Sequence, residues 1–582
     1  MSAIAGLLRS DRHTVEAEPA ERMAAAARRG GGEDASYRSP DGRAALACRG
    51  VPLLANETHD IWLVVDGEIV NQRQLRHTLE LLGHRFRSGS DAEVVLHAYE
   101  QWELDFAAHL HGAFALALWD DRRDRLVLAR DRLGGKPLFV ARHRGRLGFA
   151  STVAALLDEM AMPRRLDPAA LVRYLAVGCV PAPATLVAGI SALAPGEMLV
   201  AGRDGGPHRH RWRDLAGESA APPALRALPP DRHAGNVRTL LECAVADRLG
   251  SDGRTGVWLT PDPASGAMAA VVSRLTGTVP PSVMVAAEDG AALSAMRALA
   301  AAAGLDPVEV RCGPAELADA LPALVAAMPA PVALPEVVPA WFAAAALARG
   351  RGRAMLAHGG AGQVLLDAPA YAPLRPRGWR RFLRWLAAPA RALPSPLFGA
   401  EMAGLLDVEL PQVVPQLPPL PGWLAEDALA VAGLDDLMLR VTDGVAPAID
   451  AAAQAHGLTA RLPFLDQALV DYALVVPGRV RANPRVLGDL VPAGVQGRPL
   501  PAALPLAAWL AGPLGELVEQ RAARWPLFNR AAVAALLAAH RVNPVHGGQL
   551  WALVVLAEWC ASLGLDTIAP AEAGAELVYS RL

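Results

Sequence analysis

The chain has 582 residues, of which 52% are hydrophobic and 5% aromatic, and its formal net charge is −3. A chain of this length is usually too long to fold around one hydrophobic core, so two or more domains are expected. The nearly neutral charge gives no reason to expect a nucleic acid or an anionic membrane as partner. No uncharged, proline-free apolar run reaches about 18 residues, so no transmembrane segment is predicted.

Lysine and cysteine usage narrows the possible chemistry. Lys136 is the only lysine, which excludes any mechanism that needs a lysine elsewhere. The five cysteines are odd in number and none lies in CxxC spacing, which argues against a disulfide framework and a zinc site. The N-terminus lacks the basic region and apolar core of a signal peptide, so we expect a cytoplasmic protein.

An apolar strand is predicted at the start of the chain. Ser2 precedes it, and removal of Met1 would leave the serine hydroxyl beside its own α-amine, a pair that can act as nucleophile and base. The simpler interpretation is that a serine at position two permits Met removal and nothing more. Further strands, turns and helices are predicted at residues 62–71, 88–102, 110–120 and 126–139.

Three motifs in these segments stand in a characteristic order. Residues 66–71, 89–91 and 130–138 resemble the Asn-Gly-Glu-Ile-Tyr-Asn, Gly-Ser-Asp and Arg-Asp-Arg-x-Gly-x-Lys-Pro-Leu motifs of the asparagine synthetase family. The resemblance implies an αββα sandwich of the class II amidotransferase (N-terminal nucleophile hydrolase) type, with Ser2 at the position of the nucleophile. The positions that it implies for glutamine binding are Arg49, Asp66, Gly67, Glu68 and Asp91.

The chain departs from the family at the residues that do the chemistry. Ser2 replaces the family's cysteine, and a hydroxyl is far less ionised than a thiol at neutral pH. Asp66 replaces the oxyanion-hole asparagine, and losing one such donor costs about 3–4 kcal/mol of transition-state stabilisation. The family's His-Arg-Gly-Pro-Asp segment has no counterpart in residues 28–34. Arg49 and Asp91 also have simpler interpretations, as a surface ion pair and a helix cap. The losses at Ser2, at Asp66 and in residues 28–34 predict an inactive glutaminase.

A change in composition predicts the domain boundary. Residues 203–235 include a stretch rich in Gly, Pro, Arg and Ala without sustained periodicity, which is typical of a linker. The predicted domains are therefore residues 1–202 and 236–582.

The second domain alternates helical and extended patterns. This alternation favours a doubly wound, parallel α/β sheet with helices on both faces and a helical C-terminal part. The segments that carry the pattern are helical 236–249, apolar 279–286, helical 291–303, extended 308–311 and a strand around Met355.

Residues 257–270 predict a strand, a short loop and a helix, an order that creates an anion site at the helix N-terminus. The loop resembles the family's Leu-Ser-Gly-Gly-x-Asp-Ser-Ser, which in the family binds the pyrophosphate of ATP. Two prolines each remove an N–H donor, an aspartate adds negative charge, and an alanine replaces the family's magnesium-binding Asp. These changes predict that a micromolar ATP site becomes millimolar or weaker. The aligned residues are Leu259, Thr260, Pro261, Asp262, Pro263, Ala264 and Ser265.

A second family loop, Ser-Gly-Glu-Gly-Ala-Asp-Glu-Leu-Phe-Gly-Gly-Tyr, aligns with residues 356–367. Gly359 and Gly360 are kept, but Gly362 and Gln363 replace its Asp and Glu. No acidic pair then remains at the family's positions for Mg²⁺, so no metal site is predicted.

Other residues offer only partial substitutes for the missing groups. Asp262 and Asp367 are the acidic residues nearest to the lost ligands, and His358 is either a new catalytic residue or a packed loop histidine. Residues 459–466 resemble the family's Glu-Ala-Arg-Val-Pro-Phe-Leu-Asp, with Thr459 in place of the Glu. The catalytic lysine that follows in the family is absent, and Arg485 cannot donate a proton in the same way.

Residues 375–386, from Arg375 to Leu386, interleave arginines with Trp379, Phe382 and Trp385 at helical spacing. Such an amphipathic helix either docks on a partner, an acidic peptide or a membrane, or packs its aromatic side into the core.

Three functional hypotheses follow. The first is a catalytically inactive member without cofactors, a partner or regulatory subunit of an active synthetase paralogue or a peptide-modifying enzyme in amide-bond-forming, natural-product biosynthesis. The second is an active amide ligase with rebuilt catalytic residues that uses Mg·ATP, of the asparagine synthetase, β-lactam synthetase or lasso-peptide cyclase type. The third is a serine amidohydrolase that uses Ser2, which the substitution at Asp66 opposes.

Overall fold

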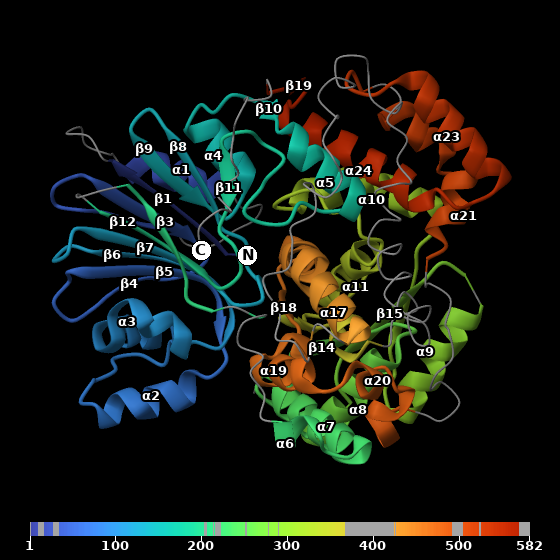
Figure 1. Cartoon of the computed structure of the whole chain (residues 1–582), viewed down its shortest axis with the longest axis horizontal. Coiled ribbons are helices and arrows are strands. Elements are labelled where there is room, and N and C mark those ends of the chain that lie inside the picture. The colour runs from blue at the N-terminus through green and yellow to red at the C-terminus, as the bar shows by residue number, and fades with distance from the viewer. Residues whose placement is uncertain are drawn as a thin grey trace.

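The computed structural model places two large α/β domains side by side (Figure 1). The N-terminal strands and the helices that flank them fill one half of the molecule, and most of the later helices and strands fill the other (Figure 1). The structure describes residues 2–9, 17–26, 34–202, 206–213, 215, 223–250, 253–277, 279–288, 290–366, 424, 427–491, 504–522 and 525–569.

The N-terminal domain is built from two six-stranded antiparallel sheets. The first sheet has the order β11 (Ile190–Ala192), β8 (Phe139–His143), β9 (Arg146–Ala150), β1 (Ala3–Arg9), β3 (Ala44–Arg49) and β2 (Asp34–Arg38). The second has the order β13 (His208–Arg211), β12 (Glu197–Gly202), β7 (Arg125–Arg130), β6 (Gly112–Asp120), β5 (Ile61–Ile69) and β4 (Leu53–Ala55).

The alternation of side chains along β1 explains the layered core. Ile4 and Leu8 pack between the two sheets, while Ala5 and Leu7 face the opposite side, towards α1 (Ala17–Ala26) and α4 (Val153–Glu159). On the other side of the sandwich, α2 (Gln72–Leu81) and α3 (Asp91–Trp102) cover the second sheet (Figure 1). The predicted αββα sandwich is confirmed.

The second domain contains a five-stranded parallel sheet. Its order is β16 (Val308–Arg311), β15 (Ser282–Ala286), β14 (Thr255–Leu259), β17 (Ala354–Leu356) and β18 (Thr459–Arg461). Along β15, Met284 and Ala286 pack on one face of the sheet, and Val283 and Val285 pack on the other.

Helices cover both faces of this sheet, which confirms the doubly wound fold. One face is covered by α7 (Pro230–Ala246), α8 (Pro263–Thr276) and α9 (Ala291–Ala302), and the other by α10 (Pro314–Ala327), α11 (Val337–Arg349) and α18 (Ala446–Ala455).

The rest of the described chain is mainly helical. These elements are α5 (Pro168–Val177), α6 (Pro223–Arg226), α12 (Ala361–Leu365), α17 (Ala428–Asp436), α19 (Gln467–Val475), α20 (Gly478–Arg481), α21 (Leu506–Ala511), α22 (Gly515–Leu517), α23 (Arg530–Val542) and α24 (Gly547–Leu563), with a small parallel pair of β10 (Arg165–Leu166) and β19 (Thr567–Ile568). None of the helices in the described ranges is long and apolar enough to cross a bilayer.

The segment expected to be a linker contains regular structure. β13 pairs with β12 and so extends the first domain beyond residue 202, and α7 begins at Pro230 instead of near Asn236. β13 was not predicted from the sequence because His208–Arg211 is an exposed edge strand without apolar alternation.

Candidate functional site

The structure brings Ser2 and Asp66 together at the glutaminase position. Ser2 lies directly before β1, and Asp66 lies in β5 of the facing sheet. The Ser2 hydroxyl donates a hydrogen bond to the Asp66 carboxylate. Asp66 is almost fully buried, and Gly67 beside it pairs with Phe114 of β6. An oxyanion hole needs a hydrogen-bond donor at this position, whereas this chain holds a carboxylate that accepts the hydrogen bond of the Ser2 hydroxyl.

The two candidate glutamine-recognition residues already have partners within the domain. Arg49 lies opposite Ala3 in the β1–β3 ladder, and its Nε lies 3.1 Å from Asp34 Oδ1. Asp91 Oδ2 accepts a hydrogen bond from the Ile69 amide at 2.9 Å, and burial raises the pKa of Asp91.

The helix cap expected at Asp91 is formed by its neighbour. Ser90 has extended backbone angles and accepts a hydrogen bond from the Ala92 amide, so it occupies the N-cap position of α3. Asp91 is the first residue inside the helix, and its carboxylate points to β5.

The only lysine of the chain connects the Asp66 position to the second domain. Lys136 Nζ lies 3.3 Å from Asp66 Oδ1 and donates to Asp450 Oδ2 at 2.7 Å, and all three side chains are buried. Burial favours the neutral amine, but the two carboxylates outweigh it and raise the pKa of Lys136. Burial also raises the pKa of Asp450, against the opposing effect of Lys136. One feature of the sequence pointed to this site, which is the single lysine of the chain within the Arg130–Leu138 motif.

Glu68, another candidate for glutamine binding, also reaches across the interface. Its two carboxylate oxygens accept hydrogen bonds from Arg461 Nη2 at 2.6 Å and Nε at 2.9 Å. Arg461 also donates to the backbone oxygen of Arg248 at 2.8 Å. A further ion pair joins Arg130 to Asp443 at 2.8 Å. Residues of the glutaminase motifs therefore hold the two domains together.

Two cavities meet at the Lys136 contact. The larger, of about 490 Å³, is lined by Ser2, Asp66 and Asp450 together with residues of α10 and α18. The smaller, of about 50 Å³, is lined by Gly67, Lys136 and Asp450. Because Asp450 lines both cavities, its ion pair with Lys136 lies at their boundary.

The loop between β14 and α8 satisfies its own backbone donors. Asp262 is the N-cap of α8 and accepts a hydrogen bond from the Ala264 amide at 2.8 Å. The Thr260 amide donates to Ser265 Oγ at 3.1 Å, the Asp262 amide to Thr260 Oγ1 at 3.3 Å, and the Ser265 amide to the Asp262 oxygen at 3.0 Å. The remaining two residues, Pro261 and Pro263, have no N–H. Every N–H of residues 260–265 is therefore either used inside the loop or absent.

His358 packs over this loop. Its Nε2 lies 3.3 Å from Thr260 Oγ1 and 3.9 Å from Asp262 Oδ2, and its ring meets Trp258 edge to face. Burial lowers the pKa of His358, against the opposing effect of Asp262 and Glu336. The imidazole therefore favours its neutral form.

The residues that follow His358 are positioned by packing and by one polar contact. Gly360 has φ +85°, and a Cβ there would lie 2.4 Å from Leu465. A Cβ at Gly359 would lie 2.9 Å from Ile449. Gln363, which stands at a family acidic position, donates to Asp436 Oδ2 at 2.8 Å. Asp367, the segment from Arg375 to Leu386 and the side chain of Arg485 lie outside the described residues.

This geometry defines a two-domain protein in which an amidotransferase-like sandwich is joined to a synthetase-like α/β domain. The glutamine amidotransferase domain model matches residues 1–212, and the asparagine synthase model matches residues 236–561. The chain belongs to the asparagine synthase family.

Two relatives show how far the similarity extends. Asparagine synthetase (glutamine-hydrolyzing) 3 of Bacillus subtilis is 34% identical over 212 residues, which are 36% of this chain and 32% of that protein. A putative asparagine synthetase (glutamine-hydrolyzing) of Mycobacterium tuberculosis is 28% identical over 564 residues, which are 87% of this chain and 85% of that protein.

Proposed function

We propose that this asparagine-synthetase-like chain is catalytically inactive at both family sites and acts as a partner or regulatory subunit in amide-bond-forming biosynthesis. Its partner is an active synthetase paralogue or a peptide-modifying enzyme. The observation that carries the proposal is the β14–α8 loop, whose N–H groups are all bonded within the loop or removed by proline.

The energetic consequence for nucleotide binding is large. Hydrogen bonds to charged groups contribute about 1.5–3 kcal/mol each, and Pro261 and Pro263 each remove one donor. The other donors would have to leave their present partners before they could reach a phosphate. The Asp262 carboxylate, already at the helix N-terminus, competes with an incoming anion for the same position. Together these effects support millimolar or weaker binding of ATP.

The glutaminase position supports the same conclusion. A tetrahedral intermediate formed at Ser2 would place its oxyanion beside the carboxylate of Asp66, which repels it and cannot donate a hydrogen bond. Lys136 stands near Asp66, but Asp450 is its closer partner, at 2.7 Å. The contacts of Asp66, Lys136 and Glu68 then serve the domain interface.

Restoring the family's residues in the β14–α8 loop tests whether this loop is what prevents ATP from binding. We expect Mg·ATP to leave the melting temperature of the wild-type protein unchanged, because no donor is available to the phosphates. The matched variant Pro261→Gly/Asp262→Gly/Ala264→Asp regains one N–H, at position 261, and one acidic ligand. It also frees the amide of residue 264 from the Asp262 carboxylate, so this variant should be stabilised by Mg·ATP. Stabilisation of the wild type at micromolar Mg·ATP would contradict the proposal.

Affinity purification from the native host tests the partner. The proposal expects the chain to recover a homologue with an intact nucleotide loop or a peptide-modifying enzyme. Repeated recovery of the chain alone would contradict it.

The alternative is an active ATP-dependent amide ligase with rebuilt catalytic residues, and one observation favours it. His358, Thr260 and Asp262 form a polar group at the edge of the former nucleotide loop. This alternative predicts ATP–pyrophosphate exchange that depends on an acceptor acid and is lost in His358→Gln. Absence of exchange with wild-type protein would count against the ligase.

A further inference from the structure

Two histidines and a glutamate converge on the outer helix layer of the N-terminal domain. His97 and Glu100 lie one turn apart on α3, and His84 lies in the loop after α2. His84 Nδ1 lies 3.2 Å from His97 Nδ1, His97 Nδ1 lies 3.0 Å from Glu100 Oε2, and the third side of the triangle measures 3.8 Å. Among the described residues, this is the one group of three His, Cys, Asp or Glu side chains whose ligand atoms all lie within 4.8 Å of one another.

These separations match the ligand cage of a tetrahedral zinc ion. Zn²⁺ binds imidazole nitrogen and carboxylate oxygen at about 2.0–2.2 Å, which puts neighbouring ligand atoms of a tetrahedral site about 3.3–3.6 Å apart. The three observed distances span this value. The side chain of His97 is 3% exposed, while those of His84 and Glu100 are 17% and 20% exposed. His97 is therefore buried in the protein, whereas His84 and Glu100 are partly exposed to solvent. A water molecule can reach the group from the solvent and supply a fourth ligand.

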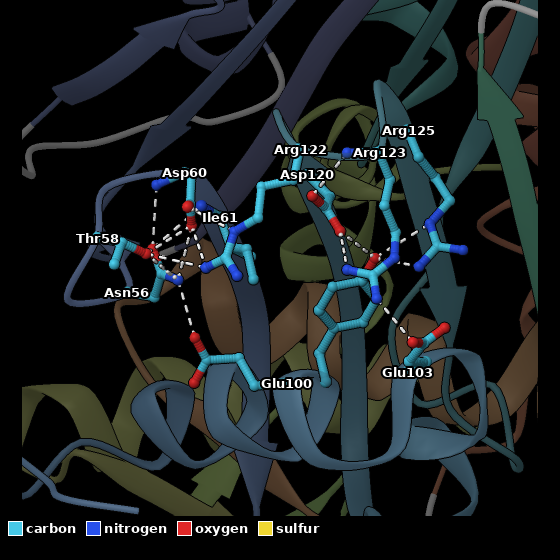
Figure 2. A network of polar contacts seen from close by, with 11 residues as sticks. Asn56, Thr58, Asp60, Ile61, Glu100, Glu103, Asp120, Arg122, Arg123 and Arg125 are labelled. Atoms are coloured by element: carbon cyan, nitrogen blue, oxygen red, sulfur yellow. Dashed lines mark hydrogen bonds and ion pairs between the residues drawn. The ribbon is translucent and has the colours of Figure 1, made fainter.

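The atoms that do not face the centre have outer partners of the kind that orient metal ligands. His84 Nε2 lies 3.1 Å from Gln101 Oε1. Glu100 Oε1 accepts a hydrogen bond from Asn56 Nδ2 at 2.8 Å (Figure 2). His97 Nε2 faces Glu57 Oε1 at 3.7 Å. The hydrogen-bond partners of His84 and Glu100 are of the kind that fix the tautomer of an imidazole and the orientation of a carboxylate.

The three facing atoms, His84 Nδ1, His97 Nδ1 and Glu100 Oε2, carry too few protons to satisfy one another by hydrogen bonds. When His84 carries its proton on Nε2 and donates to Gln101, its Nδ1 presents a lone pair to the centre. Glu100 Oε2 presents another lone pair, so one proton on His97 Nδ1 must serve two acceptors. A divalent cation would satisfy all three atoms together. Glu57 and Glu93, whose carboxylates lie 3.7 and 3.9 Å from His97 Nε2, add negative charge that favours a cation.

We propose that His84, His97 and Glu100 form a zinc site that fastens the loop after α2 to α3. Two imidazoles and one carboxylate suit Zn²⁺ and other first-row divalent ions and disfavour Mg²⁺ and Ca²⁺, which prefer oxygen ligands. The site lies in the helix layer outside the second sheet, whereas Ser2 lies directly before β1 of the first sheet. Its role is structural, and it stands independently of the catalytic state of the chain.

The test is a titration of ZnCl₂ into metal-stripped, full-length protein in competition with a chromophoric chelator. We expect one high-affinity Zn²⁺ per chain in the wild type and in His77→Asn, which alters an exposed histidine of α2 outside the group. His84→Asn and Glu100→Gln should lose this Zn²⁺. Gln101→Leu should weaken binding about 10- to 100-fold, because it removes the partner of His84 Nε2.

The readouts separate loss of the site from loss of the fold. Circular dichroism of each variant confirms folding, and if one variant does not fold, the other decides. Cobalt substitution of the wild type should give the visible absorption of a tetrahedral site, which His84→Asn lacks. The proposal is overturned if the wild type binds no Zn²⁺ at micromolar concentration, or if folded His84→Asn or Glu100→Gln retains the wild-type affinity.

Discussion

Replacement of Lys136 by methionine should strongly destabilise the protein. Methionine keeps the length and packing of the side chain but removes the charge that lies 2.7 Å from Asp450 and 3.3 Å from Asp66. Both carboxylates are buried, and removing one partner of a buried ion pair leaves an uncompensated charge. The expected loss in the free energy of unfolding at neutral pH is about 3–5 kcal/mol.

The same reasoning fixes the pH dependence of this variant. Burial raises the pKa of Asp450, and Lys136 opposes that rise. Without the lysine, the folded-state pKa lies further above the unfolded value of about 3.9, so the folded protein retains a proton that the unfolded chain releases. The stability of Lys136→Met therefore falls as pH rises from about 4 to the raised pKa, and its deficit relative to the wild type widens over that interval.

Urea denaturation followed by tryptophan fluorescence measures both effects. The double variant Lys136→Met/Asp450→Asn is the matched control, because it removes the buried charge left by the single substitution and should recover much of the loss. A deficit below about 1 kcal/mol, or one that does not change between pH 5 and about 7, would refute the assignment of Lys136 as the charge that holds this interface.

Three further predictions concern the neighbouring sites. Glu68→Gln should lower the free energy of unfolding by less than about 1 kcal/mol, because the ion pair of Glu68 with Arg461 is partly exposed. The loss should be smaller still in about 1 M salt, which screens exposed charges. A loss above about 2 kcal/mol in urea denaturation would contradict this prediction. Because the pKa of His358 is lowered in the folded protein, the unfolded chain binds a proton at this histidine more readily, and the free energy of unfolding falls as pH drops below about 6.5. In thermal melts, His358→Gln should lose less stability over this pH range than the wild type. Identical pH profiles of the two proteins would argue against a buried neutral imidazole. Wild-type protein should hydrolyse glutamine no faster than Ser2→Ala in an ammonia-release assay, whereas a faster wild type would identify Ser2 as a working nucleophile.

Local patterns predicted the layers of both domains. In β1, the continuous apolar run of residues 3–8 predicts a strand, and the structure places Ile4 and Leu8 on one face and Ala5 and Leu7 on the other. The extended segment Val308–Arg311 coincides with β16. These features depend on periodicity along a few residues, which a sequence displays directly.

The contacts that define the sites depend on residues far apart in the chain. Lys136 and Asp450 are 314 positions apart, and Glu68 and Arg461 are 393 positions apart. No local pattern indicates that Glu68, which is expected to bind glutamine, also contacts the second domain. His84 was missed for a similar reason, because its 13-residue separation from His97 matches no metal-binding spacing and becomes a contact only when the loop after α2 folds against α3.

The properties of the β14–α8 loop were predictable from the sequence only in part. Its prolines and the charge of Asp262 were evident in the sequence and predicted weak phosphate binding. The internal hydrogen bonds of Thr260 and Ser265 were not, because they depend on side-chain rotamers and on the turn into α8. The structure therefore adds a second reason to expect weak phosphate binding, which is that the remaining donors already have partners.

A calorimetric titration of Mg·ATP into the wild-type protein tests the central claim most directly. An inactive nucleotide loop predicts no saturable heat below millimolar Mg·ATP, because residues 260–265 offer no free N–H group to the phosphates. Saturable binding with a micromolar Kd at one site per chain would contradict the claim and favour an active ligase.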